Sequence, residues 1–178
     1  MRSRCKEKMS RENFVLIGMP GCGKSTLGVV AAKLLCMDFL DVDLLLQKRI
    51  GMSLQEYIDR FGTESFLEAE ADLLSSLDVS STVISTGGSA VLTERGAMRL
   101  KELGVLVYIR VPFEMLERRI SNLSCRGVAR KEGQSLRDIY EERCPIYEKY
   151  ADVTIDIGTE DIAKSCERLV ACLKDAVD

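Results

Sequence analysis

A nine-residue segment near the start of the chain constrains the fold more than any other feature. Residues 18–26 read Gly-Met-Pro-Gly-Cys-Gly-Lys-Ser-Thr and match the pattern G-x-x-x-x-G-K-[ST] at every fixed position. A short apolar run, residues 14–17, precedes this segment, and residues 24–35 have the apolar spacing of a helix. A strand before the pattern and a helix after it form the context of a phosphate-binding loop, so the segment predicts a buried parallel strand in an α/β domain.

Each residue type in this loop has a chemical purpose. The glycines let successive backbone N–H groups turn inward around a phosphate, and the helix N-terminus adds a partial positive charge. Lys24 would reach the β- and γ-phosphates, and the hydroxyl of Ser25 would ligate Mg²⁺. ATP and Mg²⁺ are therefore the expected cofactors, unless the segment is a glycine-rich turn without a ligand. The residues expected to contact the nucleotide are Gly21, Cys22, Gly23, Lys24, Ser25 and Thr26.

Apolar runs alternate with helical patterns along the rest of the chain. Further strands are expected at about 39–41, 82–86, 105–111 and 152–157. Helices are expected at about 43–50, 53–60, 64–77, 93–103, 113–122, 136–145 and 159–174. Because helices separate the strands, the pattern predicts a five-stranded parallel sheet covered on both faces. We expect one domain over 13–178, a flexible segment over 1–12 and a mobile loop over about 123–134.

The composition excludes several classes of function. The chain of 178 residues has no histidine, which excludes Ser-His-Asp and Cys-His catalysis and any His-ligated metal. Its 25 basic and 28 acidic residues give a net charge of -3, the opposite of the balance usual in nucleic-acid-binding proteins. No run approaches the roughly 18 apolar residues that cross a bilayer, and the seven cysteines form no C-x-x-C pair. We expect a cytoplasmic monomer with no nucleic-acid or membrane partner.

Two acidic residues follow the second predicted strand directly. Asp41 and Asp43 would lie at the carboxyl edge of the sheet, where ligands bind in such folds. The chain has no N-K-x-D guanine signature, and its third and fourth predicted strands end without an acid. Asp41 and Asp43 are therefore the candidate acids of the site, although one of them could instead cap the next helix.

The chain resembles the shikimate kinase family from about residue 13 to residue 173. Besides the phosphate loop, the resemblance rests on Phe39-Leu-Asp41-Val-Asp43, Gly51-x-Ser53, Phe61-Gly62, Phe66-x-x-x-Glu70, Ser85-Thr-Gly-Gly88 and Arg143-x-Pro-x-Tyr147, in that order. It implies a three-layer P-loop kinase fold with an acceptor-binding region at about 43–77 and a lid at about 123–134. It also implies transfer of the ATP γ-phosphate to a hydroxyl of a small carboxylic acid, with shikimate as the first choice.

On the acceptor side, the resemblance assigns roles to single residues. It places Asp43 on the acceptor hydroxyls, where its carboxylate could take the hydroxyl proton. It places the backbone of Gly87 and Gly88 against the substrate, and Arg143 on the substrate carboxylate.

On the nucleotide side, the resemblance implies that Asp41 lies in the outer shell of Mg²⁺, with Ser25 as a direct ligand. Arg119 corresponds to the family arginine that stacks on adenine, and Arg126 to the lid arginine that closes over the phosphates. Lys24, Asp43 and Arg126 are then the expected catalytic residues.

Several departures from the family pattern fall on the acceptor side. The family usually has Phe-Arg where this chain has Phe66-Leu67, and that arginine helps to hold the substrate carboxylate. Ser89 replaces a third glycine and Gln47 replaces an acid, while the lid reads Arg126-Gly127-Val128 in place of Arg-Pro-Leu. A charge-assisted contact is worth roughly 1.5–3 kcal/mol, so the missing arginine should matter most for an unchanged substrate.

Glu70 remains although the arginine beside it is gone. Helical spacing puts Glu70 on the apolar face with Phe66, Leu73 and Leu74, where a carboxylate needs a cationic partner. Glu70 would then pair with a structural Lys or Arg, or bind the ammonium of a hydroxy amino acid such as homoserine. A sugar acid and a nucleotide-binding sensor without catalysis are further alternatives, although the intact pair of aspartates argues against a sensor.

Overall fold

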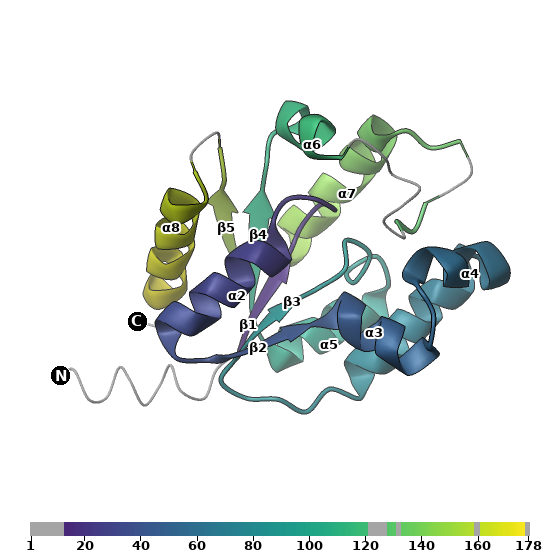
Figure 1. The fold of residues 1–178 in the computed structure, drawn as a ribbon, viewed down its shortest axis with the longest axis horizontal. Coiled ribbons are helices and arrows are strands. Elements are labelled where there is room, and N and C mark those ends of the chain that lie inside the picture. Colours follow the sequence, from purple (N-terminus) through teal and green to yellow (C-terminus); the bar gives the residue numbers. More distant parts are fainter. Residues whose placement is uncertain (1–12, 121–127, 131–132, 159–160, 177–178) are drawn as a thin grey trace.

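A five-stranded parallel sheet organises the part of the chain that the structure describes, residues 13–120, 128–130, 133–158 and 161–176 (Figure 1). The structure is a computed structural model. The sheet has the order β2-β3-β1-β4-β5, and every neighbouring pair is parallel. The strands are β1 (Asn13–Ile17), β2 (Asp38–Asp41), β3 (Thr82–Ser85), β4 (Gly104–Arg110) and β5 (Val153–Asp156). The predicted fold class and all five strands are confirmed.

Strand β1 lies at the centre of the sheet and of the core. The side chains of Phe14, Val15, Leu16 and Ile17 are at most 1% exposed, because helices cover both faces of the strand. A continuous apolar run is what a parallel strand buried on both faces requires. The phosphate loop therefore begins at a strand that is buried along its whole length.

Helices cover the sheet on both sides (Figure 1). They are α2 (Lys24–Leu35), α3 (Val42–Ile50), α4 (Leu54–Ser75), α5 (Glu94–Leu103), α6 (Phe113–Arg119), α7 (Leu136–Tyr150) and α8 (Ile162–Asp175). Helices α2 and α8 pack against each other on one face, while α5 contacts β1 and β4 from the other. None of the helices in the described residues is long and apolar enough to span a membrane.

Helix α7 differs from its prediction. The helix was expected to end near Pro145, but it continues to Tyr150. A proline inside a helix removes one backbone hydrogen bond and costs about 3 kcal/mol or more. The buried face of Ile139, Arg143 and Tyr147 has i, i+4 spacing across the proline. Packing of that face offsets the cost of Pro145, and no local pattern could have shown this.

Helix α4 joins two helices that the sequence separates. The predicted helices 53–60 and 64–77 form one element, Leu54–Ser75, which is kinked at Gly62, where φ is 85° and ψ is 164°. The side chain of Ser53 caps its start by accepting a hydrogen bond from the backbone N–H of Glu56. The gap in the predicted pattern thus corresponds to the kink.

The parallel arrangement brings the candidate site together. The phosphate loop follows β1, Asp41 ends β2, and residues 86–89 follow β3, so all three lie at the carboxyl edge of the sheet. The predicted segment 1–12 lies outside the described residues. Of the predicted loop 123–134, only residues 128–130 and 133–134 are described.

Candidate active site

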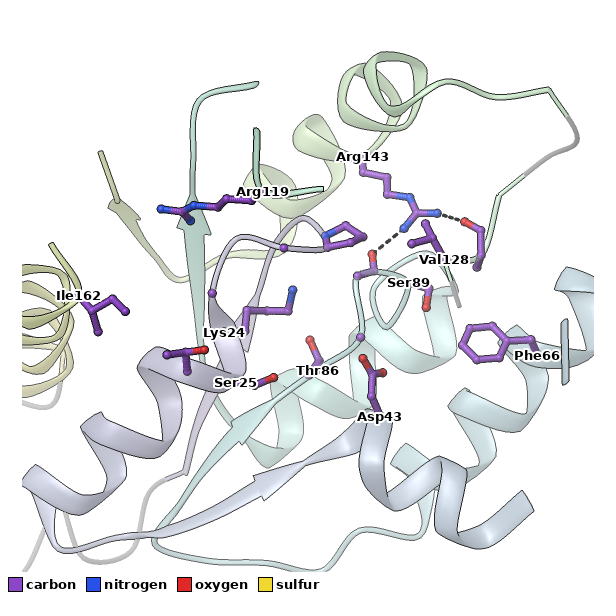
Figure 2. A pocket seen from close by; sticks show the side chains of 17 residues that line it. Lys24, Ser25, Asp43, Phe66, Thr86, Ser89, Arg119, Val128, Arg143 and Ile162 are labelled. Carbon is purple, nitrogen blue, oxygen red and sulfur yellow. Dashed lines mark hydrogen bonds between the residues drawn. The ribbon is translucent and has the colours of Figure 1, made fainter. Parts of the chain in front are cut away.

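A cavity of about 680 Å³ opens at the carboxyl edge of the sheet (Figure 2). Its lining comes from the phosphate loop, the first turn of α3, the kinked helix α4, the turn after β3 and helix α7. The lining residues are Pro20, Gly21, Gly23, Lys24, Ser25, Thr26, Asp43, Phe66, Thr86, Gly87, Gly88, Ser89, Arg119, Val128, Ala129, Arg143 and Ile162. Residues far apart in the sequence thus share one space that is large enough for two small ligands.

The phosphate loop forms the floor of this cavity. Gly23 caps α2 with φ at 104°, a left-handed conformation that a residue with a Cβ rarely adopts. The Nζ of Lys24 donates hydrogen bonds to the carbonyl oxygens of Gly18 at 2.8 Å and Met19 at 2.9 Å. The loop's own carbonyls therefore hold the ammonium group, which is 7% exposed, at the cavity centre.

Ser25 and Asp41 bear on the expected magnesium site. The Oγ of Ser25 lines the cavity and lies 3.2 Å from the Oγ of Ser85, which is the register partner of Asp41. Asp41 also caps α3, since its side chain accepts a hydrogen bond from the backbone N–H of Leu44 at 3.2 Å. Asp41 does not line the cavity, so the structure brings Ser25 but not Asp41 to its wall.

These residues fit Mg²⁺ bound together with a nucleotide. The described residues contain no group of three or more Asp, Glu, Cys or His side chains that could hold a metal alone. Mg²⁺ usually takes one or two protein ligands beside phosphate oxygens and waters, which the hydroxyl of Ser25 and a nucleotide would provide. The ion, when bound there, would neutralise charge on the phosphates.

Arg119 and Ile162 line one end of the cavity, away from Asp43 (Figure 2). Arg119 ends helix α6, and its Nη1 donates a hydrogen bond to the carbonyl of Cys22 in the phosphate loop at 3.3 Å. Arg119 is thereby held over the loop, as a residue beside the nucleotide base would be. The predicted lid arginine, Arg126, lies outside the described residues.

Asp43 lies at the other end of the cavity. Its Oδ1 is buried without a hydrogen-bond partner among the described residues. Burial raises the pKa of this carboxyl above its usual value, the charge of Lys24 counteracts the rise, and the charge of Asp41 adds to it. An unpartnered carboxylate oxygen next to the lysine of a phosphate loop is suited to accept a hydrogen bond from a ligand hydroxyl.

Gly87 is required beside Asp43 by close packing. A Cβ at this position would come within 2.7 Å of Asp43 Oδ1 and 2.6 Å of Glu70 Oε1. A Cβ at the next residue, Gly88, would come within 2.8 Å of Pro20 Cδ in the phosphate loop. A side chain at Gly87 would displace the carboxylates of Asp43 and Glu70, and one at Gly88 would displace Pro20, so with glycine the backbone of both residues lines the cavity.

Arg143 reaches the cavity from helix α7 and is 4% exposed. Its Nη1 donates to the carbonyl of Gly88 at 3.2 Å, and its Nη2 donates to the carbonyl of Ala129 (Figure 2). The hydroxyl of Tyr147 donates to the same Gly88 oxygen at 2.5 Å. The guanidinium is thus oriented by two backbone carbonyls and faces a space that an anion could enter.

Glu70 does not have the cationic partner that the sequence predicted. It is 2% exposed, and its Oε2 accepts a hydrogen bond from the Oγ of Ser89 at 2.7 Å. Its Oε1 has no partner, and no lysine or arginine in the described part of the chain forms an ion pair with it. The prediction of a structural Lys or Arg partner is therefore wrong, and a substrate ammonium as partner stays a prediction. Burial raises the pKa of Glu70 to about 8, which favours the uncharged carboxyl at neutral pH.

Some lining residues were not predicted as site residues. Thr86 and Phe66 lie inside motifs that the sequence analysis quoted, and Ser89 stood out there as a departure, so a local signal existed for them. Val128 lies inside the quoted lid pattern, whereas no residue pattern marks Ala129, which reaches the wall through its contact with Arg143.

Comparison with known proteins agrees with this geometry. The family model described as shikimate kinase matches residues 20–174. A shikimate kinase from Caldanaerobacter subterraneus subsp. tengcongensis is 33% identical over 89% of this chain and 94% of its own length. One from Clostridium botulinum (strain 657 / Type Ba4) is 36% identical over 84% of this chain and 91% of its own length.

A solved structure extends the similarity to three dimensions. The shikimate kinase from Acinetobacter baumannii in complex with shikimate superposes with a TM-score of 0.84 at 28% identity, and the match covers 93% of this chain and 94% of that one. Family model, relatives and structure each span most of the chain. The chain therefore belongs to the shikimate kinase family.

Proposed function

We propose that this chain is a Mg²⁺-dependent kinase that transfers the γ-phosphate of ATP to a hydroxyl of shikimate. One observation carries the proposal: Lys24, Asp43 and Arg143 line a single cavity, so a phosphate site, a base and a carboxylate site lie together. The relatives named shikimate kinase, and the solved relative that contains shikimate, support this choice of acceptor.

The reaction needs positioning and charge neutralisation more than covalent help from the protein. The acceptor hydroxyl oxygen forms a bond to the γ-phosphorus, and the bond from that phosphorus to the β–γ bridging oxygen breaks. ADP leaves with the electron pair, and the hydroxyl proton passes to Asp43. Lys24 stabilises the negative charge of the phosphoryl oxygens, and the hydroxyl of Ser25 would hold Mg²⁺, which would neutralise part of the phosphate charge.

Arg143 supports a carboxylic acid as the acceptor. Its guanidinium is oriented by the carbonyls of Gly88 and Ala129 and retains donors for a carboxylate. A buried, oriented guanidinium binds carboxylate strongly and with defined geometry. In this proposal Gly87 and Gly88 present their backbone to the ring of the acceptor between Asp43 and Arg143.

A hydroxy amino acid such as homoserine is the competing acceptor. It would need an ionised carboxylate that faces the cavity and binds the ammonium group. Glu70 has an unpartnered oxygen, but it is buried, does not line the cavity and has a pKa of about 8. These features support a neutral acceptor group over an ammonium, and therefore shikimate over homoserine.

Measured release of ADP in the presence of Mg²⁺ tests the proposal with shikimate, homoserine and gluconate as acceptors. We expect turnover with shikimate at micromolar concentration, at least about 100-fold greater kcat/KM than with homoserine, and loss of turnover when EDTA removes Mg²⁺. Preference for homoserine or gluconate would overturn the choice of acceptor. Tight ATP binding with no turnover on any of the three would favour the sensor.

The domain limits complete the proposal. We infer that residues 13–178 form one kinase domain with an acceptor-binding region at about 43–77 and a lid at about 123–134 that carries Arg126. A lid would exclude water and so protect ATP from hydrolysis. Arg126→Ala should then raise the ratio of ATP hydrolysis to acceptor phosphorylation. The cytoplasmic location and the monomeric state stay predictions.

A further inference from the structure

We propose that Ser89 and Glu70 form a positioning pair that holds the 87–89 turn against helix α4, beside the position where Leu67 replaces the family arginine. The inference rests on the proposed function only for its kinetic test. Its structural basis is the 2.7 Å hydrogen bond from Ser89 Oγ to Glu70 Oε2, between two residues that are 5% and 2% exposed.

The turn that this pair holds connects the two ends of the cavity. Gly87 packs against Glu70 and Asp43, while Gly88 packs against Pro20 of the phosphate loop. The carbonyl of Gly88 also accepts hydrogen bonds from Arg143 and Tyr147. A shift of this turn would therefore move the carboxylate-binding guanidinium, the base and the phosphate loop relative to one another.

The pair is the only anchor of this turn to helix α4 that the structure provides through a side-chain hydrogen bond within the described residues. In the turn itself the backbone N–H of Ala90 donates to the carbonyl of Gly87, and that of Leu92 to the carbonyl of Ser89. Those bonds shape the turn without fixing its distance from α4. Ser89 supplies that connection with a hydroxyl, which a glycine in its place would lack.

The surroundings of Glu70 match a pair with a neutral carboxyl. The charged groups that act on it are Asp43 on α3, Lys24 on α2 and Arg143 on α7. Burial raises the pKa of Glu70 to about 8; the hydrogen bond from Ser89 lowers it, Asp43 raises it, and the two cations lower it. A proton on Glu70 also reduces repulsion between its Oε1 and Asp43 Oδ1, which face the same side of Gly87.

Leu67 explains why the pair takes this form. It lies three residues before Glu70 on α4, at a spacing where side chains are neighbours, and packs against the core. An arginine at 67 would place a guanidinium beside Glu70 and favour its ionised form. With leucine there, the buried carboxyl has only the hydroxyl of Ser89 and remains largely protonated.

A double-mutant cycle between positions 67 and 89 tests the pair in the full chain. We expect Ser89→Ala to raise the KM for shikimate about tenfold with little change in the KM for ATP, as the loss of one buried hydrogen bond implies. Leu67→Arg should lower the KM for shikimate more in the Ser89→Ala background than in wild-type protein, because only there does the guanidinium replace a lost partner of Glu70 in addition to facing the substrate carboxylate. Ser75→Ala is the control, since the hydroxyl of Ser75 donates to the carbonyl of Ala71 within helix α4 and does not reach the 87–89 turn.

Two kinetic outcomes would overturn the proposal that Ser89 and Glu70 form a positioning pair. One is a KM for shikimate in Ser89→Ala within about twofold of the wild-type value; the other is an effect of Leu67→Arg on that KM that is no larger in the Ser89→Ala background than in wild-type protein. Glu70→Gln and Glu70→Ala provide a second comparison. Glutamine keeps an oxygen that accepts from Ser89, so it should raise the KM less than alanine, and equal increases would contradict the pair.

A readout without activity separates this inference from the proposed function. Carboxyl carbon NMR of wild-type protein should show Glu70 titrating near pH 8. Its midpoint should rise in Ser89→Ala and fall below about 6 in Leu67→Arg, because a hydrogen bond or a nearby cation favours the carboxylate. Unmoved midpoints in both variants would overturn the pair even if shikimate is phosphorylated, and moved midpoints would support it even if shikimate is not.

Discussion

The nucleotide end and the acceptor end of the cavity are built in different ways. In the phosphate loop the functional groups are contiguous, and Lys24 bonds to carbonyls only six and five residues away. At the acceptor end the hydrogen bonds join residues that are 14 to 59 positions apart, such as Arg143 with Ala129 and Tyr147 with Gly88. Local chain geometry builds the first region, and packing between distant elements builds the second.

This difference explains where the chain departs from its family. Its phosphate loop matches the family pattern at every fixed position, while the departures lie elsewhere: Leu67, Ser89 and Gln47 on the acceptor side, and Gly127-Val128 in the predicted lid. A change in a contiguous loop disturbs several backbone bonds at once. A change in the acceptor region alters one long-range contact, which another side chain can replace.

The largest expected effect concerns the nucleotide end of the cavity. Lys24→Ala should lower kcat about 10³-fold, because it removes a buried ammonium from the phosphoryl group. Steady-state kinetics with saturating shikimate measures the loss. Lys33→Ala, in the last turn of the same helix α2, is the control and should change little. A loss of less than tenfold in Lys24→Ala would contradict the assigned role.

The next effect concerns the acceptor end. Arg143→Met should raise the KM for shikimate about 30- to 100-fold, in line with one charge-assisted contact, and should leave the KM for ATP within about threefold. Lys149→Met on the exposed side of α7 is the control. Equal increases in both KM values would show that the two ends are not separable and would weaken the comparison.

The third effect is the pH dependence of the free energy of unfolding, which reports on Glu70 at the acceptor end. The folded-state pKa of Glu70, about 8, lies above its usual 4.5, so the folded state binds more protons than the unfolded state between these values. The free energy of unfolding should therefore fall as the pH rises, by about 2 kcal/mol from pH 5.5 to 7. Urea unfolding of wild-type protein and Glu70→Gln measures this. The Glu70→Gln variant should lack this part of the decline, and parallel curves would refute the raised pKa.

The smallest effect returns to the nucleotide end. Arg119→Ala should raise the KM for ATP about three- to tenfold, which is the range of one cation–π contact with a base. The KM for shikimate should stay the same. Arg118→Ala, one residue earlier, is the matched control. An equal effect of both arginine variants would mean that the contact of Arg119 with the phosphate loop does not position it for the nucleotide.

Much of the fold followed from local patterns. Continuous apolar runs predicted β1 and β4, because a strand buried on both faces tolerates few polar residues. The shorter strands β2, β3 and β5 contain polar residues and were predicted from their place between helical patterns. The predicted end of α7 was wrong. The proline penalty at Pro145 acts within the helix, whereas the burial of Tyr147 that offsets it depends on packing against β4. The prediction of a structural Lys or Arg partner for Glu70 was wrong because helical spacing shows which way a side chain points but not which residue it contacts.

The sequence by itself determined the phosphate loop, the order of strands and helices along the chain, and the presence of Asp43 and Arg143 at the site. Those features depend on residues close together in the chain or on one motif at a strand end. Only the tertiary structure decided that Ser89 is the partner of Glu70 and that Arg143 is oriented by two backbone carbonyls. Each of these is a contact set by how separate elements pack, and no spacing along a chain specifies the distance between two elements.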